Sequence, residues 1–261
     1  MSGLPFNPLE GLIRLLLASS LLVIVLVLSH LRRIGIGREF AVGLVKGGLQ
    51  LLLIAVILTA VFVAPLWYVW VLVMLVAMVL VAGWTSSRRA GDMPGPMGVT
   101  LPSIATGSGT VLAVLAASGA MPPGPQYVVP LAGMSIGNCM TICTLTLDRL
   151  IREARLNRGA VEAALSLGAT PDQALEVYHA ISVRSALIPT IDRLRTLGII
   201  FIPGAMAGLL LAGTAPIVAA EYQMIVYLMI VGGGIITALL TGHLARGRLF
   251  TPAEQVANWV G

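Results

Sequence analysis

Long apolar runs, separated by short polar connections, make up most of the chain. Seven of these runs are apolar enough and long enough to cross a bilayer, which takes about 20 helical residues each. They cover residues 9–29, 40–63, 66–83, 99–117, 127–147, 199–219 and 223–241. The pattern therefore predicts an all-α, polytopic membrane protein with seven transmembrane helices.

Residues 148–196 break this pattern, because they hold six of the 11 acidic residues and seven of the 16 basic ones. Thr170, Pro171 and Gln173 have the types and spacing of a helix N-cap, first helical position and capping-box partner. Gly168 suits the end of a preceding helix. We expect a helix over 159–167, a tight turn and a helix from 171 onward. This helical hairpin between spans 5 and 6 is either simply solvated or a docking element for a soluble partner, and we favour docking.

The composition limits the class of protein. Apolar residues make up 57% of the chain and charged residues 10%, whereas a soluble domain carries about 25% charged residues. A soluble enzyme or a nucleic-acid-binding domain is excluded, and we expect no nucleic-acid partner. We expect residues 1–261 to form a single transmembrane domain, with 148–196 as its cytoplasmic segment and lipid around its spans.

The basic residues indicate the orientation. Fourteen of the 16 lie in the connections 1–2, 3–4 and 5–6 or after span 7, and the other connections hold none. Cytoplasmic connections of membrane proteins are enriched in Lys and Arg. The N-terminus is therefore expected outside and the C-terminus in the cytoplasm, in the cell inner membrane.

The hairpin also carries a resemblance. Residues 162–168, EAALSLG, resemble the EAA-x-x-x-G loop of ABC-transporter permeases. The runs 134–138, 186–192, 203–208 and 211–216 are similar to the FetB-type iron-export permeases, whose plant relatives act in aluminium tolerance. The distal part of the usual permease loop is absent after Gly168. The resemblance implies two permeases with two ATPase subunits, and a coupling helix that binds the ATPase through Glu162, Ala163, Ala164, Gly168, Ala169 and Thr170.

The chain has no nucleotide-binding loop of its own. A Walker A loop requires G-x-x-x-x-G-K-[ST], and the only lysine, Lys46, lies inside a span. ATP and magnesium would therefore be bound by a separate ATPase. We expect no cofactor in this chain and no enzymatic activity from it alone.

One face of span 5 is polar and is the first candidate for a substrate path. Ser135, Asn138, Cys139 and Cys143 share this face at 100° per residue, and thiols with an amide offer ligands to a soft or borderline cation. The alternative is that the small residues pack and that Asn138 bonds to a neighbouring helix. Further candidates in and near spans 6 and 7 are Met206, Glu221 and Gln223. No cluster has the spacing of a structural metal site.

These features together predict the permease subunit of an ABC transporter that exports metal ions, iron by resemblance, with energy from a separate ATPase. One alternative is an ABC permease for another small substrate, anionic if Lys46 and Gln50 line the path. The other is a secondary transporter or channel that needs no ATPase. That alternative is disfavoured, because no Asp or Glu lies well inside a span.

Overall fold

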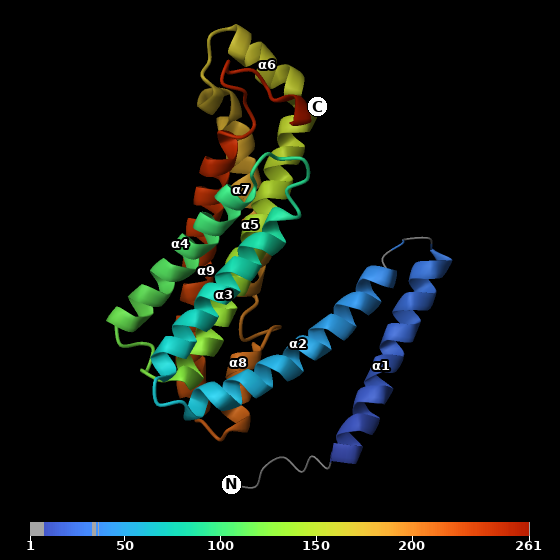
Figure 1. The fold of residues 1–261 in the computed structure, drawn as a ribbon, viewed down its shortest axis with the longest axis vertical. Helices are drawn as coiled ribbons and strands as arrows, with labels where there is room; N and C mark the ends of the chain where they lie inside the picture. Colours follow the sequence, from blue (N-terminus) through green and yellow to red (C-terminus); the bar gives the residue numbers. More distant parts are fainter. Residues whose placement is uncertain (1–7, 33–34, 36, 261) are drawn as a thin grey trace. The chain divides into compact units, whose positions relative to one another are not determined.

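The computed structural model describes residues 8–32, 35 and 37–260, and all its regular elements are helices (Figure 1). No β-strand occurs in these ranges, so the predicted all-α class is confirmed. The helices are α1 (Pro8–Leu31), α2 (Gly37–Val63), α3 (Trp67–Ser87), α4 (Met97–Ala117), α5 (Pro125–Leu156), α6 (Arg158–Ser166), α7 (Pro171–Arg195), α8 (Gly204–Leu211) and α9 (Pro216–Arg246), followed by a short 3-10 helix, η1 (Asn258–Val260).

Five of the described helices are long and apolar enough to cross a membrane: α2, α3, α4, α5 and α9. Each overlaps a predicted span, and α1 overlaps the first predicted span. Pro65 lies between α2 and α3, where the sequence predicts a break. The total of seven crossings stays a prediction.

The chain forms two compact units, Met1–Ala64 and Pro65–Gly261, and each is described by itself. In the first unit α1 packs on α2 where Gly37 approaches Leu26 and Ser29. No residue in the most apolar window of α2 is buried, which suits a helix whose solvent is lipid. That one transmembrane domain includes both units stays a prediction.

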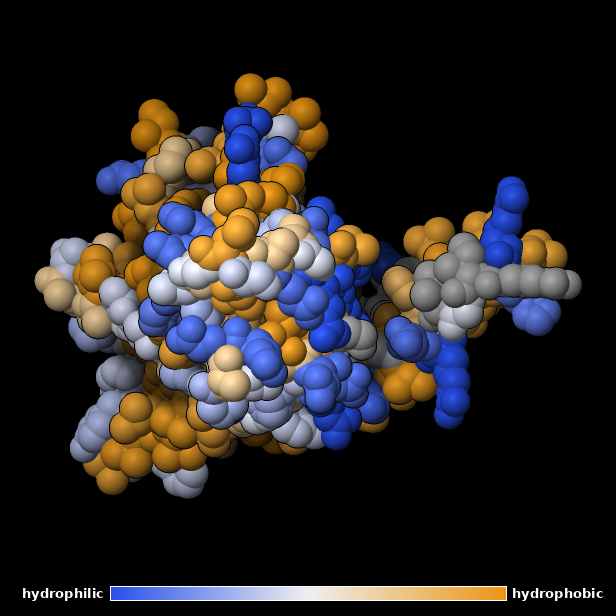
Figure 2. Space-filling model, turned by 90° about the horizontal axis from the view of Figure 1, so that it is seen from above, coloured by the Kyte–Doolittle hydropathy of each residue, from blue (hydrophilic) through white to orange (hydrophobic). Residues whose placement is uncertain are grey.

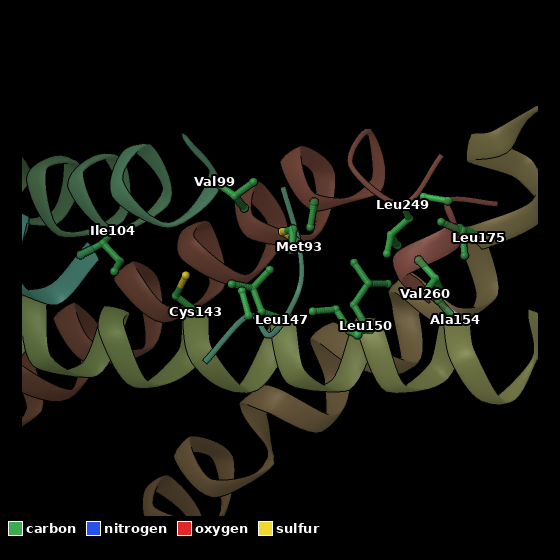
Figure 3. Close-up of a cluster of buried hydrophobic side chains, with 14 of the residues drawn as sticks. Met93, Val99, Ile104, Cys143, Leu147, Leu150, Ala154, Leu175, Leu249 and Val260 are labelled. Atoms are coloured by element: carbon green, nitrogen blue, oxygen red, sulfur yellow. The ribbon is translucent and has the colours of Figure 1, made fainter. Parts of the chain in front are cut away.

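In the second unit α5 is central and packs against α3, α4, α7 and α9. Figure 3 shows part of the core: Ile104 of α4, Leu147 and Leu150 of α5, and Leu249 and Val260 beyond α9. All of these side chains are essentially inaccessible to solvent. The core thus joins the apolar helices to the residues that follow α9.

The predicted sixth span, residues 199–219, is wrong as a continuous helix. Its only helix before α9 is α8, whose eight residues rise about 12 Å, far less than the ~30 Å of a hydrocarbon core. Pro203, Gly213 and Pro216 interrupt this apolar run: Pro203 precedes α8, Gly213 has a φ of +87°, and Pro216 starts α9. Hydropathy averaged over the run does not register these breaks.

The chain instead runs back along the second unit in α7. Asn138 of α5 contacts Ile230 of α9, and Cys143 contacts Thr241 further on, so α5 and α9 run parallel. Along α7 the order is reversed, because His179 lies against Gly242 and Leu187 lies near Gly234. Helix α7 therefore lies antiparallel to both helices and contacts both.

One end of the second unit is polar, and we call it the polar end. It comprises the last turns of α5, helix α6, the start of α7, the end of α9 and residues 247–260. Helix α5 has 32 residues and is about 48 Å long, so its last turns extend beyond a ~30 Å hydrocarbon core. These turns carry the i,i+4 ion pairs Asp148–Arg152 and Arg149–Glu153.

Candidate functional site

The turn from α6 into α7 is closed by backbone hydrogen bonds that its sequence dictates. Gly168 has a φ of +92°, a left-handed conformation that glycine adopts without strain. The N–H of Ala169 donates to the carbonyl of Ala164 at 3.0 Å, and that of Gly168 to Leu165 at 3.0 Å. This pair of bonds is the Schellman motif. The glycine of the EAA-x-x-x-G run thus terminates α6.

The following helix begins with the predicted capping box. The N–H of Gln173 donates to Thr170 Oγ1 at 3.3 Å, and the N–H of Thr170 donates to Gln173 Oε1 at 2.9 Å. Pro171 occupies the first turn. The predicted helix, turn and second helix at these residues are confirmed.

Helix α6 is held by one face and exposed on the other. Val161 is buried in the core, whereas Glu162 and Ala163 are exposed. Arg158 Nε donates to Glu162 Oε1 at 2.7 Å, an exposed i,i+4 pair. At the tip of the turn, Leu167 is 89% exposed.

Among the candidates for the substrate path, Asn138 makes a hydrogen bond to a neighbouring helix. Its Nδ2 donates to the carbonyl of Ile230 in α9 at 3.0 Å. It lies only 3.2 Å from where a Cβ would stand at Gly234, so the glycine gives the amide its space. This contact satisfies an amide that would be costly in lipid.

Cys139, Cys143 and Ser135 are buried between α5 and its neighbours. Both thiols are free. Thr241 Oγ1 donates to Cys143 Sγ at 3.4 Å, and Cys139 Sγ lies beside Gly233. The Ser135 hydroxyl has no hydrogen-bond partner among the described residues. The two thiols lie against α9 in a close-packed seam.

The remaining candidates for the substrate path lie at or near the N-terminal end of α9. The N–H of Met206, in the first turn of α8, donates to Gln223 Oε1 at 3.1 Å. Gln223 is buried and Glu221 is exposed. These residues are therefore separate from the polar face of α5. Among the described residues, no group of three or more His, Cys, Asp or Glu side chains is placed to hold a metal ion.

Residues 247–260 form a hook that sequence reasoning did not predict. Phe250 pairs with Val256, and the N–H of Ala257 donates to the carbonyl of Leu249 at 2.9 Å. Arg155 of α5 donates to the Trp259 carbonyl at 3.2 Å. The available signal was the group of apolar residues in this segment, such as Leu249, Phe250 and Val260, but the segment is too short to register beside the membrane spans.

The family "Uncharacterised protein family (UPF0014)" matches residues 12–250. The chain belongs to this family. Among UPF0014 relatives, it is 34% identical to the rice "UPF0014 membrane protein STAR2", over 97% of this chain and 88% of the relative. It is 31% identical to "Protein ALUMINUM SENSITIVE 3" of Arabidopsis thaliana, over 97% and 92%.

A third UPF0014 relative is named as a transport protein. The "Probable iron export permease protein FetB" of Escherichia coli is 29% identical, over 93% of each chain. No solved structure matches the chain. The family and its apolar helices identify a multi-pass membrane protein, and the predicted resemblance is confirmed.

Proposed function

We propose that the chain is the permease subunit of an ABC transporter that exports metal ions, with iron as the first candidate, using a separate ATPase. The proposal depends chiefly on one observation: the EAA-x-x-x-G run folds as an exposed, capped helix–turn at the polar end. The relative named as an iron export permease supports the choice of iron. The chain would act as a homodimer with two ATPases, each of which binds ATP and magnesium.

The coupling surface comprises the predicted residues Glu162, Ala163, Ala164, Gly168, Ala169 and Thr170. The polar end then lies on the cytoplasmic side of the inner membrane, with the C-terminus inside the cell and the N-terminus outside. The arginines of α5 and α6 at that end support this orientation. Leu167, at the tip of the turn, adds an apolar contact for the ATPase.

Because α7 runs antiparallel to α5 and α9, it is our candidate for the sixth membrane crossing. If α5 and α9 cross the membrane in the same direction, α7 must return the chain between them. In that arrangement the cytoplasmic segment predicted from the sequence, residues 148–196, no longer includes Arg184, Arg193 and Arg195. Each arginine at the centre of a lipid-facing helix costs about 2.5–3.5 kcal/mol. The exposed face of α7 around Arg184 is therefore proposed to face water or protein, as a permease path requires.

The course of α7 also favours a second candidate function, a permease for an anionic small molecule. Helix α7 carries three arginines outside the polar end, and arginines attract anions more readily than metal cations. Transport measurements distinguish the two substrates, whereas both candidates need the ATPase.

Contact of the substrate with Ser135, Asn138, Cys139 and Cys143 stays part of the proposal. Because Asn138, Cys139 and Cys143 contact α9, α5 and α9 must separate during transport for a substrate to reach them. Met206, Glu221 and Gln223 are proposed at the outer end of the path.

Iron content of cells tests the transport reaction. Cells that express the permease with a candidate ABC ATPase subunit should hold less iron than cells with either subunit alone. An ATPase whose Walker A lysine is replaced serves as the control. Equal iron depletion by the permease alone would contradict the proposal and indicate a secondary transporter.

Binding of the ATPase tests the coupling surface. Glu162→Arg should weaken the permease–ATPase complex about tenfold or more, as expected for a charge reversed in an interface. The double variant Arg158→Glu with Glu162→Arg restores an ion pair within α6 but not the original surface. It should remain defective. Normal binding by both variants would show that α6 is not the coupling helix.

A further inference from the structure

A groove of about 570 Å³ lies between α6 and the C-terminal hook, residues 247–260. One wall is the predicted coupling helix, with Arg158, Glu162 and Ala169. The other wall is the tip of the hook, with Glu254 and Asn258. The exposed face of α6 is therefore only half of a larger concave surface.

The hook is fixed rigidly to the helices. Leu249 and Val260, at its two ends, are buried in the core. Arg248 donates to the carbonyl of Pro94, in the connection between α3 and α4, at 3.2 Å, and Trp259 Nε1 donates to the carbonyl of Arg248 at 3.2 Å. The groove wall is thus a preformed part of the second unit rather than a loose tail. Preformed surfaces bind with less loss of conformational entropy.

Glu254 stands at the tip of the hook in a strained conformation. Its φ is +57°, the one positive value among the described non-glycine residues. Backbone strain of this kind persists where the surrounding structure imposes it, and it is concentrated at functional sites. Glu254 also lines a second pocket of about 480 Å³, next to Asp172 and Arg246. It therefore separates two hollows at the polar end.

The charge of the groove is unbalanced. Arg158 and Glu162 neutralise each other at 2.7 Å, whereas the Glu254 carboxylate has no hydrogen bond or ion pair with any described residue. The groove thus presents one free carboxylate, together with the apolar surface of Leu165 and Val256. Figure 2, which looks onto this end, shows hydrophilic and hydrophobic residues interspersed on the surface. A protein segment with a basic side chain amid apolar residues complements this groove.

We propose that the C-terminal hook forms half of the ATPase-binding surface, and that the α6–hook groove receives a segment of the ATPase whose Lys or Arg pairs with Glu254. This inference rests on the proposed function, because it takes the ATPase as the partner. It assigns a role to residues outside the EAA-x-x-x-G run. The Glu254 contact lies beside α6, so that movement of the ATPase acts on α5 and α9 through both walls at once.

The test measures binding of the purified full-length permease to a candidate ABC ATPase subunit. Glu254→Lys should raise the dissociation constant about tenfold or more, because it places a cation against the basic partner. Glu254→Gly permits the same backbone conformation and removes the side chain together with its charge, so it should raise the constant a few-fold. Asp92→Lys, the same charge reversal at an exposed position outside both hollows, should stay within about twofold.

Salt dependence separates a charge contact from a change in folding. Wild-type binding should weaken with added salt more steeply than binding by Glu254→Gly, because only the wild type loses an ion pair. Since Glu254 is exposed, thermal stability should be unchanged in Glu254→Lys and Asp92→Lys. Glu254→Gly should be slightly more stable, because glycine adopts this φ without strain. Wild-type affinity in Glu254→Lys, with an unchanged salt slope, would overturn this inference and leave the coupling role of α6 intact. Absence of binding by the wild type would overturn the proposed function itself, together with this inference.

Discussion

Gly107 of α4 lies directly against Thr237 of α9. A Cβ at Gly107 would overlap Thr237 Oγ1 and would also stand 2.8 Å from the backbone carbonyl of Gly233. Rotation of the threonine would relieve the first contact but not the second. The two helices therefore approach closely because position 107 has no side chain.

Replacing Gly107 with alanine should consequently destabilise the second unit by about 1–3 kcal/mol, the usual cost of overpacking a core. The expected result is a lower midpoint of thermal unfolding of the purified protein in detergent. Gly109→Ala is the matched control, since nothing lies within 4 Å of its Cβ position. It should be neutral or slightly stabilising, as alanine favours helix. Equal midpoints for the two variants would show that α4 and α9 are not in this contact.

Asn138→Ala should lower stability by about 0.5–2 kcal/mol, the range for a polar contact between membrane helices. The variant loses the bond to the Ile230 carbonyl and leaves space beside Gly234. Thr141→Ala, which removes only a bond to the preceding turn of the same helix, is the control. Unfolding midpoints and transport should be measured together. Loss of transport at unchanged stability would assign Asn138 to the substrate instead of to the helix contact.

The helices α2, α3 and α4 were predictable because each has a high mean hydropathy over about 20 residues. The capping box at Thr170 and the turn at Gly168 were predictable as well, because they depend on local sequence alone. Residues 199–219 were mispredicted as one helix, because Pro203, Gly213 and Pro216 interrupt the apolar run. The place of α7 depends on packing against α5 and α9, which hydropathy does not report. Its charged residues, such as Arg184, argued for a solvated segment.

Close packing was equally hard to locate from sequence. Gly133 and Gly137 have the spacing of a small-residue helix contact, but a Cβ at Gly137 would meet nothing within 4 Å. A close approach of two helices lies instead at Gly107 and Gly233, whose partners depend on the three-dimensional arrangement. The run Gly232–Gly234 does not break α9, which is continuous through it. These glycines make room for Cys139 and Asn138.

Gly168→Ala should weaken the coupling turn. A non-glycine residue in the left-handed region costs about 1–2 kcal/mol, and the Schellman bonds that end α6 depend on this conformation. Hydrogen exchange of residues 158–170 should accelerate, and affinity for the ATPase should fall several-fold. Gly159→Ala lies within α6 at an ordinary φ and is the control. Unchanged exchange in Gly168→Ala would contradict the assigned role of this glycine.

The proposed crossing by α7 predicts water access at Arg184. In a variant with Cys139 and Cys143 replaced by alanine, Arg184→Cys should react with a membrane-impermeant, charged thiol reagent. Leu239→Cys, an exposed apolar position in α9, should face lipid and react at least tenfold more slowly. Slow reaction at both positions would place the α7 face against protein or lipid rather than a water-filled path.

The two native cysteines report directly on whether the α5–α9 seam opens. Cys139 and Cys143 are the chain's only cysteines, and both are fully buried. A membrane-permeant maleimide should therefore leave the resting permease unlabelled. If substrate passes between α5 and α9, labelling should rise several-fold when the ATPase partner hydrolyses ATP, because separation of the helices exposes the thiols.

An added cysteine at Asp92, which is exposed, controls for reagent activity and should react equally in both states. The ATPase with its Walker A lysine replaced should keep Cys139 and Cys143 protected, which separates turnover from mere binding. Full protection of both thiols during measured transport would place the path elsewhere than in the polar face of α5. In that case the seam of Cys139, Cys143 and Gly233 is a structural contact that stays closed throughout the cycle.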